Sequence, residues 1–259
     1  MKLSTCILWI FLVTFNASAQ DFGAYEKKYF VVETDTLPYR LLLPENYDAK
    51  KSYPLIFFMH GAGERGNDNE RQLMHGGKLF LQSDTRKNYP AIVVFPQCAA
   101  TSFWSNVAFN RDSAGKNQFN FIADRPMTQA MQLAQGLLYQ LIHTYPVKKE
   151  QVYVAGLSMG GMGTFELVGR NPLVFAAATP ICGGGNPATA EKMTGTDWWI
   201  FHGEKDDEVP VSLSHKMNDA LKKAGANVKL TIYPGTNHNS WDQAFAEPGL
   251  LKWLFTQRR

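Results

Sequence analysis

The sequence predicts an α/β protein with a mostly parallel sheet that is covered by helices on both faces, and three observations support this fold class. Residues 53–59 are apolar at every position, as in a strand buried on both faces. Strand-like and helix-like segments then alternate along the chain. Residues 152–157 form an apolar run that leads through Gly-x-Ser-x-Gly into a helical segment. With 259 residues and 45% hydrophobic content, we expect one domain over residues 20–259.

The first 19 residues are expected to be a secretory signal peptide. Lys2 precedes an apolar run at residues 6–15, which is too short for a stable membrane span, and Ala-Ser-Ala at 17–19 is a small-x-small cleavage site. No later stretch reaches spanning length, so we expect the mature protein to be soluble and either secreted or periplasmic. Loss of Lys2 changes the formal net charge from +3 to +2. This near-neutral balance predicts neither nucleic acid nor an anionic membrane as a partner. The sequence pattern does not indicate the oligomeric state.

The remaining elements are predicted from hydrophobic periodicity and from turn residues. Strands are expected near residues 30–33, 39–43, 53–59, 89–96, 152–157, 175–181, 197–201 and 228–233. Helices are expected over residues 72–82, with an interruption at Gly76-Gly77, and over 127–144, 159–169, 211–224 and most of 241–259. Residues 97–125 show no clear period and are predicted to be a long loop rich in aromatic residues.

Ser158 lies at the predicted corner between a strand and a helix. This context is what a nucleophile elbow requires. Gly156 and Gly160 flank the serine, and the sharp turn leaves no room for a side chain at either position, while the nucleophile itself is strained. A bare Gly-x-Ser-x-Gly match is also compatible with a glycine-rich turn that contains an incidental serine, so the rest of the chain must decide.

A serine nucleophile needs a base and an orienting acid, and in this topology both belong in loops at the carboxyl ends of strands. The acidic candidates follow the strand at 197–201 and are Glu204, Asp206, Asp207 and Glu208. The histidine candidates are His202, His215 and His238. His238 follows the last predicted strand, which produces the chain order serine, acid, histidine that a hydrolase fold uses. We expect His202 to have a structural or hydrogen-bonding role at its strand end.

Five motifs occur in one order along the chain, at residues 60–66, 96–98, 156–161, 202–206 with 209–210, and 238–242. With these motifs the chain resembles the α/β-hydrolases of the carboxylesterase, feruloyl esterase and predicted peptidase group. This group includes family 1 carbohydrate esterases and relatives of prolyl oligopeptidase. The resemblance runs from about residue 30 to the C-terminus, and it implies an α/β-hydrolase fold with a mostly parallel sheet of about eight strands.

The resemblance implies a role for each matching residue. Ser158 is the expected nucleophile, and His238 the general base and then the general acid. Asp206 is the expected orienting acid, because it takes the fifth position of the His-Gly-x-x-Asp pattern, and Asp207 is its nearest alternative. Scattered histidines predict no metal site.

Two backbone amides are expected to form the oxyanion hole. The residue after the nucleophile supplies one donor, which is Met159 here. The resemblance places the second donor at Ala62. We expect Glu64 and Arg65 to form an ion pair that stabilises this loop, with substrate contact as the alternative.

These features predict a secreted serine carboxylic-ester hydrolase that works through an acyl-enzyme and needs no cofactor. Its expected substrates are small or polysaccharide-linked esters, including acyl and feruloyl esters of plant polysaccharides. Trp104 and Trp241 are expected to bind substrate, because aromatic faces stack on sugar rings and aryl acids. The alternatives are a serine peptidase of the prolyl oligopeptidase type and a non-catalytic binding protein on a hydrolase fold. Cys98 and Cys182 allow a disulfide, but the sequence does not show whether they pair.

Overall fold

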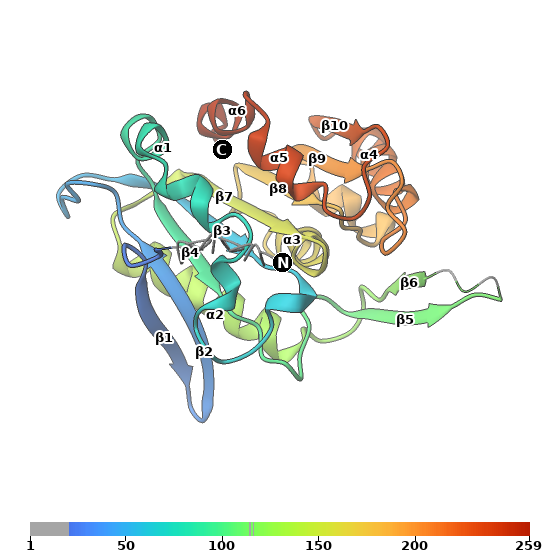
Figure 1. Cartoon of the computed structure of the whole chain (residues 1–259), viewed down its shortest axis with the longest axis horizontal. Coiled ribbons are helices and arrows are strands. Elements are labelled where there is room, and N and C mark those ends of the chain that lie inside the picture. Colours follow the sequence, from blue (N-terminus) through green and yellow to red (C-terminus); the bar gives the residue numbers. More distant parts are fainter. Residues whose placement is uncertain (1–20, 114, 116) are drawn as a thin grey trace, which may run out of the picture.

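An eight-stranded sheet forms the centre of the protein (Figure 1). The computed structural model describes residues 21–113, 115 and 117–259. The strands of this sheet are, in spatial order, β1 (Glu26–Val32), β2 (Asp35–Leu42), β4 (Ile92–Pro96), β3 (Tyr53–Met59), β7 (Val147–Leu157), β8 (Ala177–Ile181), β9 (Asp197–Gly203) and β10 (Val228–Tyr233). β2 pairs antiparallel with β1 and with β4, and all later pairings are parallel. The predicted α/β-hydrolase architecture is therefore confirmed.

Helices cover both faces of the sheet, as the apolar central strands require. The main helices are α1 (Ser83–Asn88), α2 (Gln129–Thr144), α3 (Met159–Arg170), α4 (Ser212–Ala224), α5 (Trp241–Ala246) and α6 (Leu250–Thr256). In β3, Leu55 and Phe57 pack into a core with α2, α3 and α4, whereas Ile56 and Phe58 pack into a second core with α5 and α6. This alternation of side chains within one apolar strand explains why it has no polar face.

The predicted loop at residues 97–125 contains a β-hairpin. Its strands are β5 (Val107–Arg111) and β6 (Asn117–Phe121), which pair antiparallel as a separate two-stranded sheet. Figure 1 shows this hairpin projecting away from the main sheet. The prediction of an irregular loop was wrong for these ten residues, because the alternation of aromatic and polar residues in them follows a strand period.

Two predicted helices are broken in the structure. Residues 72–82 form the short 3₁₀ helices η2 (Arg71–Leu73) and η3 (Gly77–Leu81), separated by Gly76 at φ 88°. Two further 3₁₀ helices are η1 (Ala62–Glu64) and η4 (Pro187–Met193). The C-terminal helical segment divides into α5 and α6 around Pro248-Gly249. The expected signal peptide lies outside the described residues, among which no helix is long and apolar enough to cross a membrane.

Candidate active site

Ser158 occupies the corner at which β7 passes directly into α3. Its backbone angles are φ 53° and ψ −117°, in a region that residues with side chains rarely adopt. The corner is closely packed, because a Cβ on Gly156 would overlap the carbonyl of Gly160, and a Cβ on Gly160 would overlap the carbonyl of Met59. Both flanking glycines are therefore sterically required, and the serine between them is held in a strained conformation.

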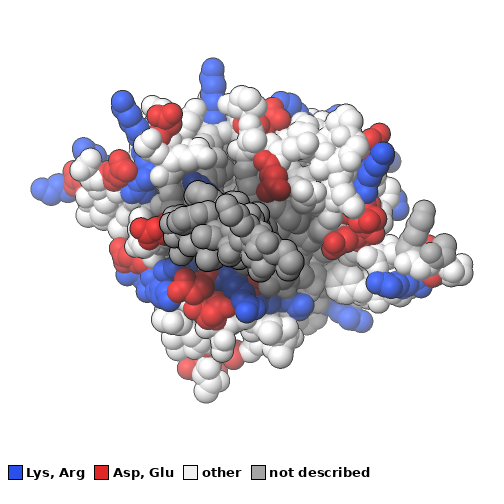
Figure 2. All heavy atoms as spheres, in the orientation of Figure 1, with Lys and Arg blue, Asp and Glu red and all other residues white. Residues whose placement is uncertain are grey.

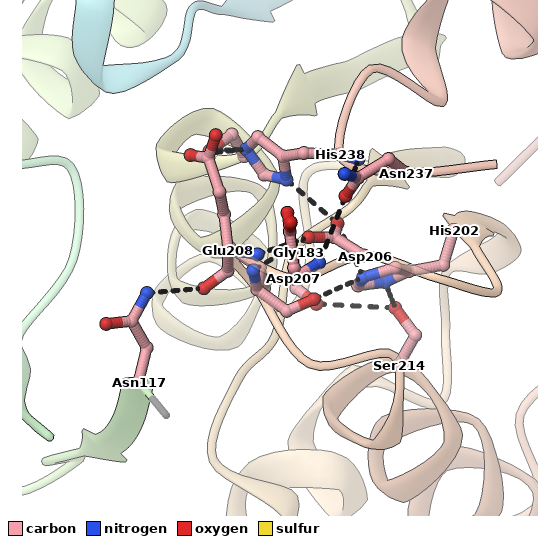
Figure 3. Close-up of polar contacts among 11 residues, drawn as sticks. Asn117, Gly183, His202, Asp206, Asp207, Glu208, Ser214, Asn237 and His238 are labelled. Carbon is pink, nitrogen blue, oxygen red and sulfur yellow. Dashed lines mark hydrogen bonds and ion pairs between the residues drawn. The ribbon is translucent and has the colours of Figure 1, made fainter. Parts of the chain in front are cut away.

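His238 lies in the loop after β10 and contacts the serine and an acid at the same time. Its Nε2 is 2.9 Å from Ser158 Oγ. Its Nδ1 is 2.8 Å from Asp206 Oδ2, a contact shown in Figure 3. An ionised carboxylate only accepts hydrogen bonds, so Nδ1 carries the hydrogen and Nε2 presents a lone pair to the serine hydroxyl. The side chain is 12% exposed, which leaves the ring accessible from the surface.

Asp206 has a buried side chain with both carboxylate oxygens occupied. Oδ1 accepts hydrogen bonds from the backbone amides of Glu208 and Val209, at 3.0 and 2.8 Å, and Oδ2 faces His238 and His202. Burial alone raises the pKa of this carboxyl, but the hydrogen bonds from His202, His238 and Val209 outweigh it and bring the pKa well below its usual range. Asp206 is therefore held as the charged partner of His238.

Asp207, the alternative acid, takes a different position. It is exposed, and its backbone N–H donates to Asn237 Oδ1 at 3.1 Å. The same Asn237 oxygen accepts the backbone N–H of His238 at 2.7 Å, so this side chain joins the acid loop to the histidine loop (Figure 3). The structure therefore brings Asp206 to His238 through its carboxylate, and Asp207 only through its backbone.

His202 is fully buried behind the acid (Figure 3). Its Nε2 lies 2.8 Å from the Val209 carbonyl and 3.1 Å from Asp206 Oδ2, while its Nδ1 lies 2.7 Å from Ser214 Oγ. Two acceptors face Nε2, so that nitrogen carries the hydrogen. Sequence reasoning placed His202 at a strand end but missed its contact with Asp206. The four-residue spacing within His-Gly-x-x-Asp was the available clue.

Two backbone amides, those of Met159 and Ala62, donate to no acceptor among the residues that the structure describes. Met159 is the first residue of α3 and Ala62 is the first residue of η1, directly after β3. Neither N–H donates a hydrogen bond to another described residue. The amide of Met159 also lies at the positive end of the α3 dipole, which favours negative charge. Free donors at these two positions are what a developing oxyanion requires.

Arg65 supports the loop that carries Ala62. Its guanidinium donates to the carbonyls of Ala62 and Ser102, at 3.0 and 3.2 Å. The expected ion pair between Glu64 and Arg65 is wrong, because the buried Glu64 is directed to His75 instead, with 3.8 Å between Oε1 and Nε2. Adjacent side chains point in different directions here, and Arg65 stabilises the loop through carbonyl groups.

The two tryptophans expected to bind substrate differ in exposure. Trp104 is 0% exposed, and its Nε1 donates to the His60 carbonyl at 3.1 Å, so its ring is part of the core beneath the Ala62 loop. This burial contradicts a substrate-binding role for Trp104. Trp241 is partly exposed, and its ring lies 5.4 Å from the His238 ring at 87° and 5.0 Å from the His75 ring. Trp241 therefore borders the histidine.

Cys98 and Cys182 are both buried and free. Burial raises the pKa of the Cys98 thiol to about 12 and raises that of Cys182 as well. Ligand atoms of Cys182, Asp206 and His238 lie within 4.8 Å of one another. A metal there would need a thiolate and a free imidazole nitrogen, whereas burial disfavours the Cys182 thiolate and both nitrogens of His238 already face Asp206 and Ser158. Asp206 and His238 are arranged for proton transfer with Ser158, and Cys182 takes no part in that line of contacts.

Comparison with known protein families finds a match over most of the chain. A family model described as "Putative esterase" matches residues 34–245. The chain belongs to this esterase family. Membership in this family agrees with the esterase resemblance that the sequence motifs showed.

Solved structures of esterases share the fold of this family member. The crystal structure of a thermostable esterase has 31% sequence identity and a TM-score of 0.81, covering 92% of this chain and 64% of that one. The chain thus spans less than two thirds of that esterase's length. The feruloyl esterase module from Clostridium thermocellum, complexed with sinapinate, has 17% identity and a TM-score of 0.63, covering 92% of this chain and 91% of that one. A ferulic acid esterase from Anaeromyces mucronatus, in complex with ferulic acid, has 14% identity and a TM-score of 0.64, covering 92% of this chain and 93% of that one.

Proposed function

We propose that this esterase is a serine carboxylic-ester hydrolase that works through an acyl-enzyme, with Ser158, His238 and Asp206 as its catalytic triad. The observation that carries the proposal is the continuous line of contacts from Asp206 Oδ2 through His238 to Ser158 Oγ, at 2.8 and 2.9 Å. A serine hydroxyl is a weak nucleophile at neutral pH, and this arrangement supplies the base and the orienting acid that activate it.

Acylation follows from the geometry. As Ser158 Oγ attacks the ester carbonyl, its proton passes to His238 Nε2, and the charge of Asp206 stabilises the resulting imidazolium. The carbonyl oxygen becomes an oxyanion, which the amides of Met159 and Ala62 bind. The tetrahedral intermediate then collapses, the bond to the alcohol breaks, and His238 returns its proton to the leaving alkoxide.

Deacylation repeats these steps with water. Water donates a proton to His238 Nε2 and attacks the acyl carbonyl, and the same two amides bind the second oxyanion. Collapse of this intermediate releases the carboxylic acid, and His238 returns the proton to Ser158 Oγ. One histidine therefore serves each half of the reaction first as base and then as acid.

The decisive experiment combines active-site labelling with turnover. Purified protein is treated with a fluorophosphonate probe and assayed on p-nitrophenyl acetate and methyl ferulate. We expect labelling and hydrolysis in the wild type, and loss of both in Ser158→Ala with an unchanged circular dichroism spectrum. Labelling that persists in Ser158→Ala identifies another nucleophile and overturns the proposal.

For the substrate class we propose acyl and feruloyl esters of plant polysaccharides. Support comes from the named ligands of two similar folds, ferulic acid and sinapinate, and from the partly exposed Trp241 beside His238. The same triad can also cleave amides, so esters and peptides are to be compared directly, and dominant peptide turnover would replace this proposal by a peptidase. We further propose export through the N-terminal 19 residues, which N-terminal sequencing of the mature protein tests.

A further inference from the structure

The β5–β6 hairpin has two different faces. Side chains alternate along each strand, so one face carries Val107, Phe109, Arg111, Asn117, Phe119 and Phe121, and we call it the inner face. The opposite, outer face carries Ala108, Asn110, Gln118 and Asn120, all of them exposed. On the inner face Phe109 and Phe119 are cross-strand partners with ring centroids 5.3 Å apart, and Phe109 is still 54% exposed. The hairpin thus presents aromatic rings that the core does not bury.

One end of the inner face reaches the loop that carries the catalytic acid. Asn117 Nδ2 donates to the Glu208 carbonyl at 2.9 Å, and Glu208 Oε2 lies 3.8 Å from His238 Nε2 (Figure 3). In the proposed mechanism this nitrogen hands its proton to the leaving alcohol. The hairpin therefore meets the loop whose Glu208 side chain lies next to His238 Nε2.

The other end of the inner face continues towards the oxyanion loop. A hollow of about 340 Å³ is lined by Phe103, Val107, Phe109 and Arg65, among others. The Phe103 ring packs edge-on against Phe109 at 5.1 Å, and Arg65 lies over Phe103 at 5.8 Å while donating to the Ala62 carbonyl. This end of the hairpin therefore contacts Phe103, and through Arg65 it is linked to the loop that carries Ala62.

Contacts with the body of the protein keep the hairpin in this position. Asn186 Nδ2 donates to the Phe121 carbonyl at 3.0 Å, and the Phe121 ring packs against Gly184, where an added Cβ would meet it at 3.2 Å. An isolated two-stranded hairpin is marginally stable in water, so these anchors matter for its order. Phe109 is still 54% exposed although it packs against Phe103 and Phe119, so part of its ring is accessible to a ligand.

The chemistry of the inner face selects its occupant. Flat aromatic rings lie at its middle, and the hydrogen-bonding groups of Asn117 and Arg111 lie at its tip. Sugar rings combine an apolar face with hydroxyl groups at the edge, and aromatic rings next to amide and guanidinium groups match both features. A nucleic acid would require a basic stripe, whereas Figure 2 shows acidic and basic side chains interspersed among the described residues of the visible face.

We propose that the inner face of the hairpin binds the carbohydrate that forms the alcohol part of the ester. The proposal rests on the proposed function of Ser158. The acyl group occupies Ser158, and the sugar chain extends from the Nε2 side of His238 along Phe109 and Phe119. The hairpin is then a specificity determinant for the alcohol, and the length of the sugar chain affects binding.

The test compares two esters with the same acyl group and different alcohols. The kcat/KM values for acetylated xylo-oligosaccharides and for p-nitrophenyl acetate are measured in wild type, Phe109→Ala and Phe119→Ala. We expect kcat/KM for the oligosaccharide, divided by kcat/KM for p-nitrophenyl acetate, to fall about tenfold in each variant, mainly because KM for the oligosaccharide rises. A tenfold change corresponds to about 1.4 kcal/mol, which is the size expected for ring stacking. Asn120→Ala is the matched control, because Asn120 lies on β6 next to Phe119 but on the outer face. Its ratio should equal that of the wild type.

The outcomes separate this proposal from the proposed function. If the wild type is not labelled at Ser158 and cleaves neither ester, the proposed function itself fails. If Ser158 is labelled and p-nitrophenyl acetate is cleaved, but the ratio is the same in all variants, only the role of the hairpin is overturned. An equal loss on both esters, or a wild type that cleaves only the small ester, also overturns it. Melting temperatures of the variants show whether the hairpin mutations unfold the protein.

Discussion

The buried imidazole of His202 contacts the same oxygen of Asp206 that His238 uses. His202 Nε2 lies 3.1 Å and His238 Nδ1 2.8 Å from Asp206 Oδ2. The His202 ring is fixed by Ser214 Oγ at its other nitrogen, at 2.7 Å. His202 therefore positions the Asp206 carboxylate without contacting Ser158. Among the interactions that lower the pKa of Asp206, the hydrogen bond from His202 has the largest effect.

Removal of this contact should alter the acid side of the pH profile. Without His202 the pKa of Asp206 rises, so the carboxylate takes up a proton at a higher pH than in the wild type. As the solution is acidified, the activity of the variant should therefore begin to fall at a higher pH. A hydrogen bond to a charged group contributes about 1.5–3 kcal/mol, so we expect His202→Ala to lower kcat about tenfold or more with little change in KM. His202→Gln, which keeps a donor, should recover part of the rate. A pH profile that merely scales down without shifting would show that His202 has only a structural role.

The choice between the two aspartates can be tested by the same substitution at each position. Asp206→Asn leaves the geometry in place but removes the charge that holds the His238 tautomer, and we expect turnover to fall about 10⁴-fold. Asp207→Asn is the matched control, because Asp207 reaches this network through its backbone N–H. It should keep turnover within a few-fold of wild type on p-nitrophenyl acetate. Comparable losses at both positions would contradict the assignment of Asp206.

Substitution by alanine should be costly at Gly160 and nearly neutral at Gly63. A Cβ on Gly160 would overlap the carbonyl of Met59, whereas a Cβ on Gly63 meets no heavy atom within 4 Å. We expect Gly160→Ala to lower the free energy of unfolding by more than about 3 kcal/mol, because the overlap is with backbone that cannot move aside. Gly63→Ala should change it by about 0.5 kcal/mol or less. Urea denaturation of both variants measures this, and similar midpoints would refute the steric account of the elbow.

The sheet and the chain order of the three proposed triad residues were predictable from sequence for a topological reason. Fully apolar runs such as β3 report burial on both faces, and parallel strands bring their carboxyl ends to one edge. Ser158, Asp206 and His238 each follow a different strand, so their convergence needed no knowledge of tertiary contacts. The preference for Asp206 over Asp207 came only from the family resemblance, because the sequence does not show which carboxylate receives the amides of Glu208 and Val209.

Other features depended on packing that a sequence pattern does not contain. Trp104 was expected to bind substrate, yet it is buried against His60. The hairpin was missed although Phe109 and Phe119 alternate with polar residues and a turn containing Gly115 separates the strands, because its inner face does not join the main core. Local alternation reveals a strand, but only the fold shows where that strand points.

His60 should make the protein less stable in mild acid. Its ring is fully buried, with Nε2 accepting the Cys98 N–H at 2.9 Å and Nδ1 facing the Gly61 carbonyl at 2.6 Å, and burial lowers its pKa to about 4. The unfolded chain takes up a proton near the ordinary histidine pKa of about 6.5, whereas the folded protein does so only near 4. Between these values the unfolded state binds more protons, so the free energy of unfolding falls as the pH falls, by up to about 1.4 kcal/mol per pH unit, and below 4 this residue causes no further loss.

His60→Gln keeps an acceptor for Cys98 but cannot titrate. We expect this variant to be less stable than wild type at neutral pH, and the gap in denaturation free energy to narrow on going from pH 7 to about pH 4.5. Parallel stability curves for the two proteins over this range would mean that His60 does not contribute to the acid sensitivity of the fold.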